Sequence, residues 1–438
     1  MQHDFWQGEA EPGVPYWWQA LDTPEAAEAL PDRCDLLVVG AGYAGLSAAI
    51  AAHDCGADVV VVDAGEPGRG ASTRNGGMMG AHPRLGWADL AKRFGAATAD
   101  ALFAEARPAL DWVRHLIERE GVACDLQQTG RIQLAWTPRH LESQRALVRH
   151  VREKSEVRID MVERAELGRE IETERYFGGI VFPEHCAIHP AKFHQGLLHA
   201  VRRRGIPVVG HARAEGAERI ASGFDVATGK GRVRADKVVL CTNGYTAEPF
   251  RWHAARVFPL PSYIIATEEL PANLPGHLAP GRRMMVETRA RHSYFRLSPD
   301  GRRVIWGGRA SMRDLPPRQA AARLRETMIG VWPELADAKI THVWTGNTGF
   351  SFNQMPHVGE DRGLHHAMGF SGSGTVMAPY LGAKAAYRAV GDPRGATAYA
   401  DTTLRRHWLH PGGKPHFLKA ADLWYRQWVD RVENFRAR

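Results

Sequence analysis

The chain has 438 residues, of which 44% are hydrophobic and 24% charged, as is typical of a folded globular protein with two or three domains. Its formal net charge of +7 comes from 56 basic and 49 acidic side chains. The basic residues are spread along the chain and form no recognisable nucleic-acid module, so nucleic acid is excluded as the expected partner. The five cysteines lack metal-site spacing, which predicts free thiols and no bound metal.

The N-terminal sequence shows neither the basic nor the apolar region of a secretory signal. The apolar run at 36–52 is interrupted by three glycines and is too irregular to cross a bilayer. We therefore expect a cytoplasmic protein without a membrane span. The sequence gives no indication of the oligomeric state.

A buried strand at 36–39 opens the most informative segment of the chain. It leads into Gly40, Gly42 and Gly45 in the spacing G-x-G-x-x-G, and a helix of small residues and a second strand follow. In this pattern the first glycine allows a tight turn, the second lets backbone N–H groups approach a pyrophosphate, and the third allows close packing of helix on strand. Asp63 ends the second strand, where a carboxylate accepts hydrogen bonds from ribose hydroxyls. The segment predicts a dinucleotide-binding βαβ unit.

The rest of the chain alternates between nucleotide-fold elements and a different kind of structure. A long glycine-rich loop at 65–82 has the character of a functional loop. Periodicity then predicts, in chain order, helices over 87–172 with a strand at 130–136, a helix from 190, strands at 206–209 and 224–228, and a buried strand within 235–245. Further on it predicts an antiparallel sheet over 258–308, a helix at 318–332, and a last strand that leads through Gly372 and Gly374 into a long helix.

Several motifs of the chain occur together in one known family. They are GAGYAGLSAA, GASTRNGG at 70–77, VVLCTNGY, PSYIIATEEL, YFRLSPDGRRVIWGGR and GFSGSGTVMAPYLG. With them the chain, over about residues 15–430, resembles the FAD-dependent oxidoreductases of the D-amino-acid oxidase and sarcosine oxidase superfamily. Within that superfamily it is most similar to the gamma-glutamylputrescine oxidase-like branch.

The resemblance implies an α/β fold with an α+β cap, in which a Rossmann-like FAD-binding domain of interrupted sequence is joined to an antiparallel-sheet substrate cap. The expected domains follow from it. They are an N-terminal extension at 1–34, the FAD-binding domain at 35–85, 185–250 and 340–400, the helical and sheet-based cap at 86–184 and 251–339, and a C-terminal helical extension at 401–438.

The resemblance also implies which residues hold FAD. The first glycine motif with Asp63 would hold the pyrophosphate and adenosine ribose, the loop at 74–77 would pass the pyrophosphate and the flavin ring, and the turn at 372–374 would face the flavin. The implied set is Gly40, Gly42, Tyr43, Ala44, Gly45, Asp63, Ala64, Arg74, Asn75, Gly76, Gly77, Ala214, Thr242, Asn243, Gly372, Ser373 and Gly374.

The chain departs from the family pattern at three points. Ser373 stands where this branch commonly has a histidine. No cysteine follows Cys241, so the covalent flavin attachment of sarcosine oxidase-like enzymes is excluded and FAD is expected to bind non-covalently. No lysine lies between Lys237 and Lys339, and the family's oxygen-activating lysine is therefore missing from the cap strands. Slow reaction with oxygen is expected.

The reaction implied by the resemblance is FAD-dependent oxidation of a C–N bond in a small amine or amino acid. The imine that forms is then hydrolysed to an aldehyde or keto acid plus an amine. Of the cap residues, His292 would adjust the protonation of the substrate amine, Tyr263 and Tyr294 would close over the substrate, and Arg309 would bind a substrate carboxylate.

Two alternative functions remain open from the sequence. An FAD-dependent aromatic hydroxylase would share the first βαβ unit, but it is expected to carry a G-D motif where this chain reads GFSGSG. A non-catalytic flavoprotein or electron-transfer subunit is the second alternative, because a fold alone does not determine function.

Overall fold

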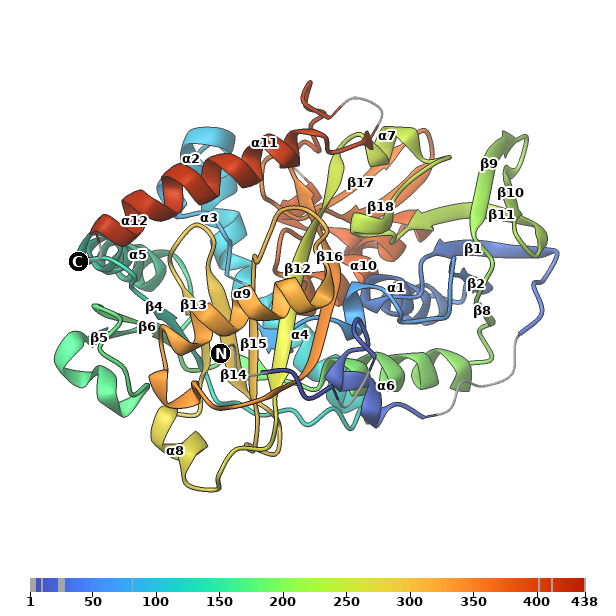
Figure 1. Ribbon diagram of the computed structural model, residues 1–438. Coiled ribbons are helices and arrows are strands. Elements are labelled where there is room, and N and C mark those ends of the chain that lie inside the picture. The colour runs from blue at the N-terminus through green and yellow to red at the C-terminus, as the bar shows by residue number, and fades with distance from the viewer. Residues whose placement is uncertain are drawn as a thin grey trace.

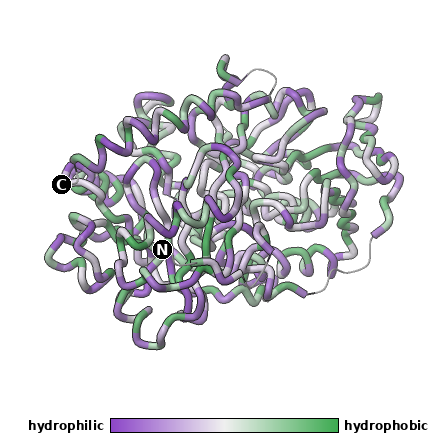
Figure 2. The backbone as a smooth tube through the Cα atoms, in the orientation of Figure 1, coloured by the Kyte–Doolittle hydropathy of each residue, from purple (hydrophilic) through white to green (hydrophobic). Residues whose placement is uncertain are grey.

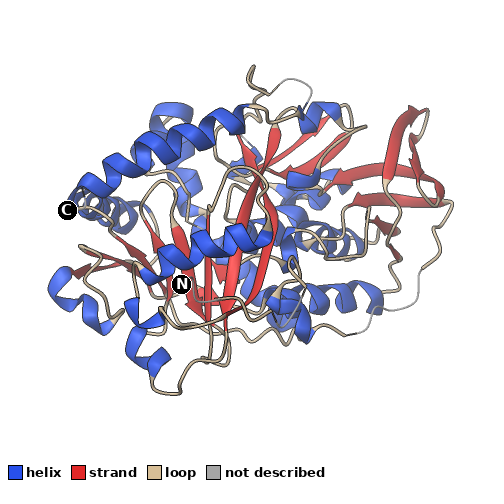
Figure 3. Cartoon of the chain, viewed as in Figure 1, coloured by secondary structure: helices blue, strands red, loops and turns tan. Residues whose placement is uncertain are grey.

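The computed structural model describes residues 5–8, 11–22, 28–80, 82–400, 402–410 and 413–436. In this part of the chain two eight-stranded sheets lie side by side, with helices covering their outer faces (Figures 1 and 3). The expected α/β architecture with a second, sheet-based part is confirmed.

The first sheet is mainly parallel and contains the βαβ unit. Its strands are β1 (Arg33–Val39), β2 (Val59–Val62), β8 (Val208–Val209), β9 (Ala214–Ile220), β10 (Gly223–Thr228), β11 (Gly231–Leu240), β17 (His357–Asp361) and β18 (Leu364–Met368). The order β18-β11-β1-β2-β8 is parallel throughout, β17 pairs antiparallel with β18, and the β9–β10 hairpin extends from β11. The parallel segments at 36–39 and 59–62 are wholly apolar. Both of their faces are buried, since one packs against helices and the other against side chains of the β9–β10 hairpin.

Helix α1 (Tyr43–His53) starts at the glycine turn after β1 and packs against α10 (Gly374–Val390). Almost all of α1 is buried, which explains its small residues. A Cβ atom at Gly382 of α10 would lie 2.1 Å from the carbonyl oxygen of Ala44, and a Cβ atom at Gly45 would lie 1.7 Å from the carbonyl oxygen of Gly40. These two glycines therefore allow α1 to pack tightly against both α10 and the turn.

The second sheet forms the cap. Its strands are β4 (Arg131–Leu134), β5 (Asp160–Glu163), β6 (Gly178–Phe182), β12 (Val257–Thr267), β13 (Met284–Glu287), β14 (Ser293–Leu297), β15 (Val304–Gly308) and β16 (Ile340–Ser351). Helix α9 (Pro317–Ile329) covers one face of β12, β15 and β16, as Figure 1 shows. A short separate sheet pairs β3 (Met78–Met79) with β7 (Cys186–Ala187).

The cap sheet differs from the sequence expectation in two ways. It is antiparallel except where β13 pairs parallel with β4, since these strands come from separate segments of the chain and no hairpin turn fixes their direction. Strand β16, which the expected boundary at residue 340 placed in the FAD-binding domain, pairs along its length with β12 in the cap sheet. The chain therefore leaves the cap after β16.

The remaining helices lie outside the two sheets. They are α2 (Trp87–Phe94), α3 (Ala96–Ala104), α4 (Ala106–Arg119), α5 (Pro138–Lys154), α6 (Pro190–Arg203), α7 (Arg251–Ala254), α8 (Leu274–Leu278), α11 (Phe417–Trp424) and α12 (Asp430–Arg436). The helical region predicted over 87–172 thus resolves into α2 to α5 with strands β4 and β5.

The C-terminal helices α11 and α12 cross the cap (Figure 1). The backbone N–H of Met312 donates to the Asp422 carboxylate over 2.8 Å, and the N–H of Ala290 donates to Glu433 over 3.2 Å. These bonds fix the two loops that flank β14 and β15.

Hydrophobic residues concentrate in the strands and in the helices between them, whereas the outer loops are hydrophilic (Figure 2). All five cysteines are free, as expected. Within the described ranges, no helix combines the length and apolarity that a membrane crossing needs. Within the same ranges, no three His, Cys, Asp or Glu side chains are grouped as a metal ion would require.

The contact between α1 and α10 gives a stability prediction. Gly382→Ala should lower the free energy of unfolding by about 1–3 kcal/mol, because the new Cβ is forced against the backbone of α1. Gly276→Ala is the matched control, since a Cβ there contacts nothing within 4 Å. Thermal unfolding of the two variants measures the difference, and equal midpoints would contradict this account.

Candidate functional site

Two cavities meet between the first sheet and the cap. The nucleotide-side cavity, of about 490 Å3, is lined by the ends of β1, β2 and β11 and the start of α1. The cap-side cavity, of about 470 Å3, is lined by side chains of β4, β12, β13 and β14 and by Arg309. The cavities share the lining residues Ala71, Asn75, Thr348, Gly372 and Thr375, and they therefore lie next to each other.

Asp63 organises the nucleotide-side cavity. Its carboxylate accepts hydrogen bonds from the backbone N–H of Ala41 over 2.7 Å and of Gly65 over 3.0 Å, so that it joins the turns after β1 and β2. Burial raises the pKa of Asp63, and the two N–H donors act in the opposite direction. The carboxylate still lines the cavity and retains acceptor positions for a ligand.

The start of α1 is shaped by the loop that precedes β3. Ser72 accepts the backbone N–H of Tyr43 through its hydroxyl oxygen over 3.0 Å. A Cβ at Gly42 would lie 2.8 Å from that oxygen, so Gly42 leaves room for Ser72 as well as for a ligand. Gly40 has φ of +108°, a conformation that requires glycine. Gly40 thus forms the tight turn predicted from the motif.

The N-terminus of α10 lies where the two cavities meet. Gly372, with φ of +102°, lines both of them, and Ser373 donates its hydroxyl to the carbonyl of Phe370 over 2.8 Å. The first N–H groups of a helix are unpaired and carry a partial positive charge, which favours an anionic ligand group at this junction.

Most residues implied as FAD-binding come together here. The nucleotide-side cavity is lined by Gly40, Gly42, Tyr43, Ala44, Asp63, Ala64, Asn75, Ala214, Thr242, Asn243, Gly372 and Gly374. Arg74, Gly76 and Ser373 line the cap-side cavity.

Two implied residues, Gly45 and Gly77, line neither cavity. Gly45 faces the backbone of the first turn, and a Cβ at Gly77 would lie 2.2 Å from the carbonyl oxygen of Ile188. Gly45 and Gly77 therefore allow close backbone packing. Arg74 lines the cap-side cavity, but its guanidinium donates to the carbonyls of Gly13 and Thr345 and is committed to the fold.

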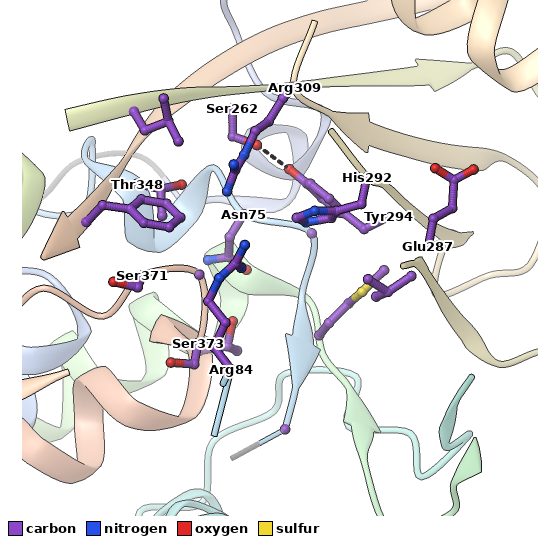
Figure 4. A pocket seen from close by; sticks show the side chains of 18 of the residues that line it. Asn75, Arg84, Ser262, Glu287, His292, Tyr294, Arg309, Thr348, Ser371 and Ser373 are labelled. Carbon is purple, nitrogen blue, oxygen red and sulfur yellow. Dashed lines mark hydrogen bonds between the residues drawn. The ribbon is translucent and has the colours of Figure 1, made fainter. Parts of the chain in front are cut away.

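The cap-side cavity brings three of the four expected cap residues together, as Figure 4 shows. The hydroxyl groups of Tyr294 and Ser262 lie 2.9 Å apart. Arg309 and Arg84 enter the cavity from opposite sides next to His292, with their guanidinium groups directed toward each other (Figure 4). Both guanidinium groups also lie over the ring of Phe350, at 5.0 and 5.5 Å from its centre.

The cap-side cavity is electropositive. Five arginines line it, namely Arg74, Arg84, Arg131, Arg289 and Arg309, against the single acid Glu287. That acid is already occupied, since it accepts from Arg289 over 2.6 Å, Tyr176 over 2.7 Å and the N–H of Ser293 over 2.8 Å. No ion pair of Arg84 or Arg309 occurs among the described residues, and burial together with Arg84 lowers the pKa of Arg309 to about 9. An anionic ligand would offset both charges.

His292 is a neutral group in this cavity. Burial lowers its pKa well below 6.5, and the nearby positive charges of Arg309 and Arg84 act in the same direction. His292 therefore does not supply a positive charge that could support oxygen reduction at neutral pH. A neutral imidazole can accept a proton or a hydrogen bond.

Tyr263 is not part of the cavity, contrary to expectation. Its neighbour Ser262 on β12 faces the cavity, whereas Tyr263 faces the opposite side and packs under α9. Its hydroxyl donates to the carbonyl of Arg313 over 2.7 Å and accepts the N–H of Leu315 over 2.9 Å. Successive side chains alternate across a sheet, so an error of one residue changes the assigned face.

Sequence reasoning missed Arg84, Arg131 and Phe350. Arg84 follows the expected functional loop by only two residues. Arg131 and Gln133 face the cavity, while Ile132 and Leu134 are buried on the other side of the sheet. The alternation of polar and apolar residues in this strand was the signal that could have identified Arg131.

Comparisons with known proteins identify the family and the fold of the chain. The family model described as "FAD dependent oxidoreductase" matches residues 35–388. The chain is 30% identical to a probable oxidoreductase OrdL of Rhizobium meliloti (strain 1021) over 400 residues, which cover 88% of this chain and 90% of that protein. It is 27% identical to a gamma-glutamylputrescine oxidoreductase of Escherichia coli (strain K12) over 383 residues, covering 87% of this chain and 88% of that protein.

A crystal structure of glycine oxidase from Geobacillus kaustophilus has the same fold, with a TM-score of 0.70 and 20% identity. The match covers 86% of this chain and all of that one.

The position of Tyr263 gives a prediction that separates packing from catalysis. Tyr263→Phe should lower the free energy of unfolding by about 1 kcal/mol, because the N–H of Leu315 loses its acceptor, and should leave KM within about twofold. Tyr294→Phe is the contrasting variant, since it removes a hydroxyl from the cavity. Steady-state kinetics and chemical unfolding measure both effects. A large rise in KM for Tyr263→Phe would return this residue to the site.

Proposed function

Since the chain belongs to the FAD-dependent oxidoreductase family, we propose that it uses non-covalently bound FAD to oxidise a C–N bond of a small amine or amino acid. The observation that carries the proposal is that a cavity at an acid-ended βαβ unit adjoins a second, electropositive cavity in the cap. One relative is named for oxidation of gamma-glutamylputrescine, an amine, and the match to it extends over both parts.

The residues present fit FAD. Asp63 offers carboxylate oxygens beside the N-terminus of α1, as an adenosine ribose next to a pyrophosphate requires. Gly40, Gly42 and Gly372 line the nucleotide-side cavity with backbone alone. A Cβ at Gly40 would lie 3.0 Å from the carbonyl oxygen of Cys241, and one at Gly42 would lie 2.8 Å from the hydroxyl of Ser72, so both turns require glycine. The N-terminus of α10 supplies further N–H groups at the junction. The thiol of Cys241, which lines the nucleotide-side cavity, stays protonated because burial raises its pKa to about 12, and non-covalent binding is supported.

When bound, FAD would accept the hydride from the substrate α-carbon. The protein has to hold that carbon in place and keep the amine uncharged. Arg309 would bind an anionic group of the substrate. The hydrogen-bonded hydroxyls of Ser262 and Tyr294 would contact the remainder of the substrate and restrict its orientation in the cavity. His292, being neutral, would accept a proton from the substrate ammonium group. Water then hydrolyses the imine to a carbonyl compound and an amine.

The five free cysteines, four of them buried, support a reducing compartment, and we place the protein in the cytoplasm.

The deciding experiment is an anaerobic screen. Primary and secondary amines and N-alkyl amino acids are mixed with the purified holoenzyme, and flavin absorbance is followed. Bleaching by an amine with formation of the matching aldehyde or keto acid is the expected result. If only NAD(P)H bleaches the flavin, the aromatic hydroxylase takes precedence, and if no donor does, the protein is not an enzyme of this class.

The mode of FAD binding has its own test. Acid precipitation should release the flavin into the supernatant, and flavin retained in the pellet would show a covalent bond.

Asp63→Ala should weaken FAD binding about tenfold or more, because hydrogen bonds to a charged acceptor contribute about 1.5–3 kcal/mol. Asp35→Ala is the control, since Asp35 also accepts a backbone N–H but lies outside both cavities. Equal FAD affinity of the two variants would remove Asp63 from the site.

The role of Arg309 is tested by a substitution that keeps its charge. Arg309→Lys should raise KM for a carboxylate-bearing amine about tenfold or more, because lysine cannot form a bidentate pair. FAD binding should not change. Arg302→Lys is the control, since Arg302 pairs with Glu269 on the surface. An unchanged KM, or a preference for uncharged amines, would contradict this role.

Reoxidation of the reduced enzyme by oxygen should be slower than reoxidation by artificial dyes, and its rate should be constant between pH 6 and 8. The pKa of His292 is depressed well below 6.5, so this side chain is already neutral at pH 6 and has no charge to lose as the pH rises. Arg309 stays charged because its pKa of about 9 lies above this range. Stopped-flow reoxidation that accelerates as the pH falls through 7 would show that a histidine cation contributes.

A further inference from the structure

We propose that Arg131 and His82 form a second anion subsite in the cap-side cavity, which binds a carboxylate at the end of the substrate opposite to Arg309. This inference rests on the proposed function, because it defines the substrate class as amines that carry two separated carboxylates. Both residues line the cavity.

The geometry of the subsite is built around one aromatic ring. The guanidinium of Arg131 lies over Phe182, 4.9 Å from the ring centre, and its Nη2 atom lies 3.0 Å from Nε2 of His82. The His82 and His185 rings stack on the same phenyl ring, at 4.5 and 4.8 Å between centres. These contacts hold the guanidinium plane in a fixed orientation.

The charge of Arg131 has no counter-ion among the described residues. Its Nε atom is buried there without a hydrogen-bond partner. The imidazole rings of His82 and His185 beside it are uncharged, since burial and the positive charge of Arg131 keep the pKa of both histidines well below the usual value. Neither ring therefore provides a counter-ion for Arg131. Burial also lowers the pKa of Arg131 to about 10, and the group remains cationic at neutral pH.

Other buried arginines of the chain are satisfied by the protein. Arg296 donates to the carbonyls of Gly77, Ile188 and Leu297, and Arg289 pairs with Glu287. A buried charge is costly unless it is paired or hydrogen-bonded. Arg131 lacks both an acid and a set of carbonyl acceptors, and it faces an open cavity. A ligand carboxylate fits this position, because the planar guanidinium can bind both oxygens.

The sheet sets the distance between the two anion positions. Arg309 follows β15, and Arg131 lies on β4, with β14 and β13 between these strands. Three strand spacings of about 4.8 Å place their backbones on the order of 14 Å apart across the sheet. Both side chains extend into the cavity, so the two guanidinium groups can lie closer together than the backbones. The substrate must therefore be elongated, with the reactive amine between its carboxylates.

Binding of unreactive dicarboxylates to the holoenzyme tests this inference without turnover. The α,ω-dicarboxylates from malonate to sebacate are compared with monocarboxylates of equal chain length by calorimetry and by perturbation of the flavin spectrum. The wild-type protein should bind one length of dicarboxylate at least tenfold more tightly than the matching monocarboxylate. No such preference at any length would overturn the inference, and this measurement needs no variant.

Variants then assign the preference to its residue. Arg131→Gln should abolish the preference for dicarboxylates while leaving monocarboxylate binding unchanged, and Arg131→Lys should retain part of this preference. Arg309→Lys should weaken both ligand types. Arg219→Gln is the matched control, because Arg219 also lies over a phenyl ring, that of Phe224, but outside both cavities. A dicarboxylate preference that survives Arg131→Gln would overturn the assignment.

The inference and the proposed function fail separately. Amine oxidation without any dicarboxylate preference refutes the subsite alone. A dicarboxylate preference that depends on Arg131, in a protein whose flavin no amine reduces, supports the subsite and refutes amine oxidation.

Discussion

The close packing of α1 on α10 is the contact on which the arrangement of the site depends. Both helices follow parallel strands of the first sheet, and both therefore begin at its carboxyl edge. Gly382 lets α10 approach the backbone of α1 at Ala44, so the separation of the two N-termini is fixed by backbone contact. One N-terminus lines the nucleotide-side cavity and the other lies at its junction with the cap-side cavity. A dinucleotide bound along this edge would therefore be held at the N-termini of α1 and α10, and the contact between the two helices sets the distance between them.

The loop between β2 and β3 couples this edge to the cap. Arg74 donates to the carbonyl of Thr345 on β16, and the indole of Trp344 donates to the carbonyl of Arg74 over 2.9 Å. Asn75 closes the same loop on itself by accepting the N–H of Gly77. Arg74, which the family pattern associates with cofactor binding, thus links this loop to the cap sheet, and a substitution at Arg74 is expected to change the cap-side cavity that it lines.

The sequence was most informative where structure is local. The βαβ unit is contained within about 30 residues, and its glycines and terminal acid have fixed spacing. The sequence could therefore predict that Gly40, Gly42 and Asp63 lie together, and all three line the nucleotide-side cavity. The cap sheet assembles from distant segments, and the parallel pairing of β13 with β4 has no local signal. Which face of β12 is inside depends on that assembly, and for this reason Ser262 lines the cavity where Tyr263 was expected. Arg84 and Arg131 were missed on the same ground, because only the folded chain brings them into the cavity that Arg309 also lines.

The electrostatics of the cap-side cavity follow from its use of arginine. A lysine with a depressed pKa would lose its charge near neutral pH when buried, whereas arginine remains cationic under the same burial. The cavity therefore keeps its attraction for carboxylates across the physiological range, even though Arg84, Arg131 and Arg309 lack acids among the described residues. Burial keeps His292 neutral, and the positive charges of the cavity act in the same direction. These charges also favour loss of a proton from a substrate ammonium group nearby, since like charges oppose each other. One set of fixed charges would thus bind the acidic part of a substrate and prepare its amine for oxidation.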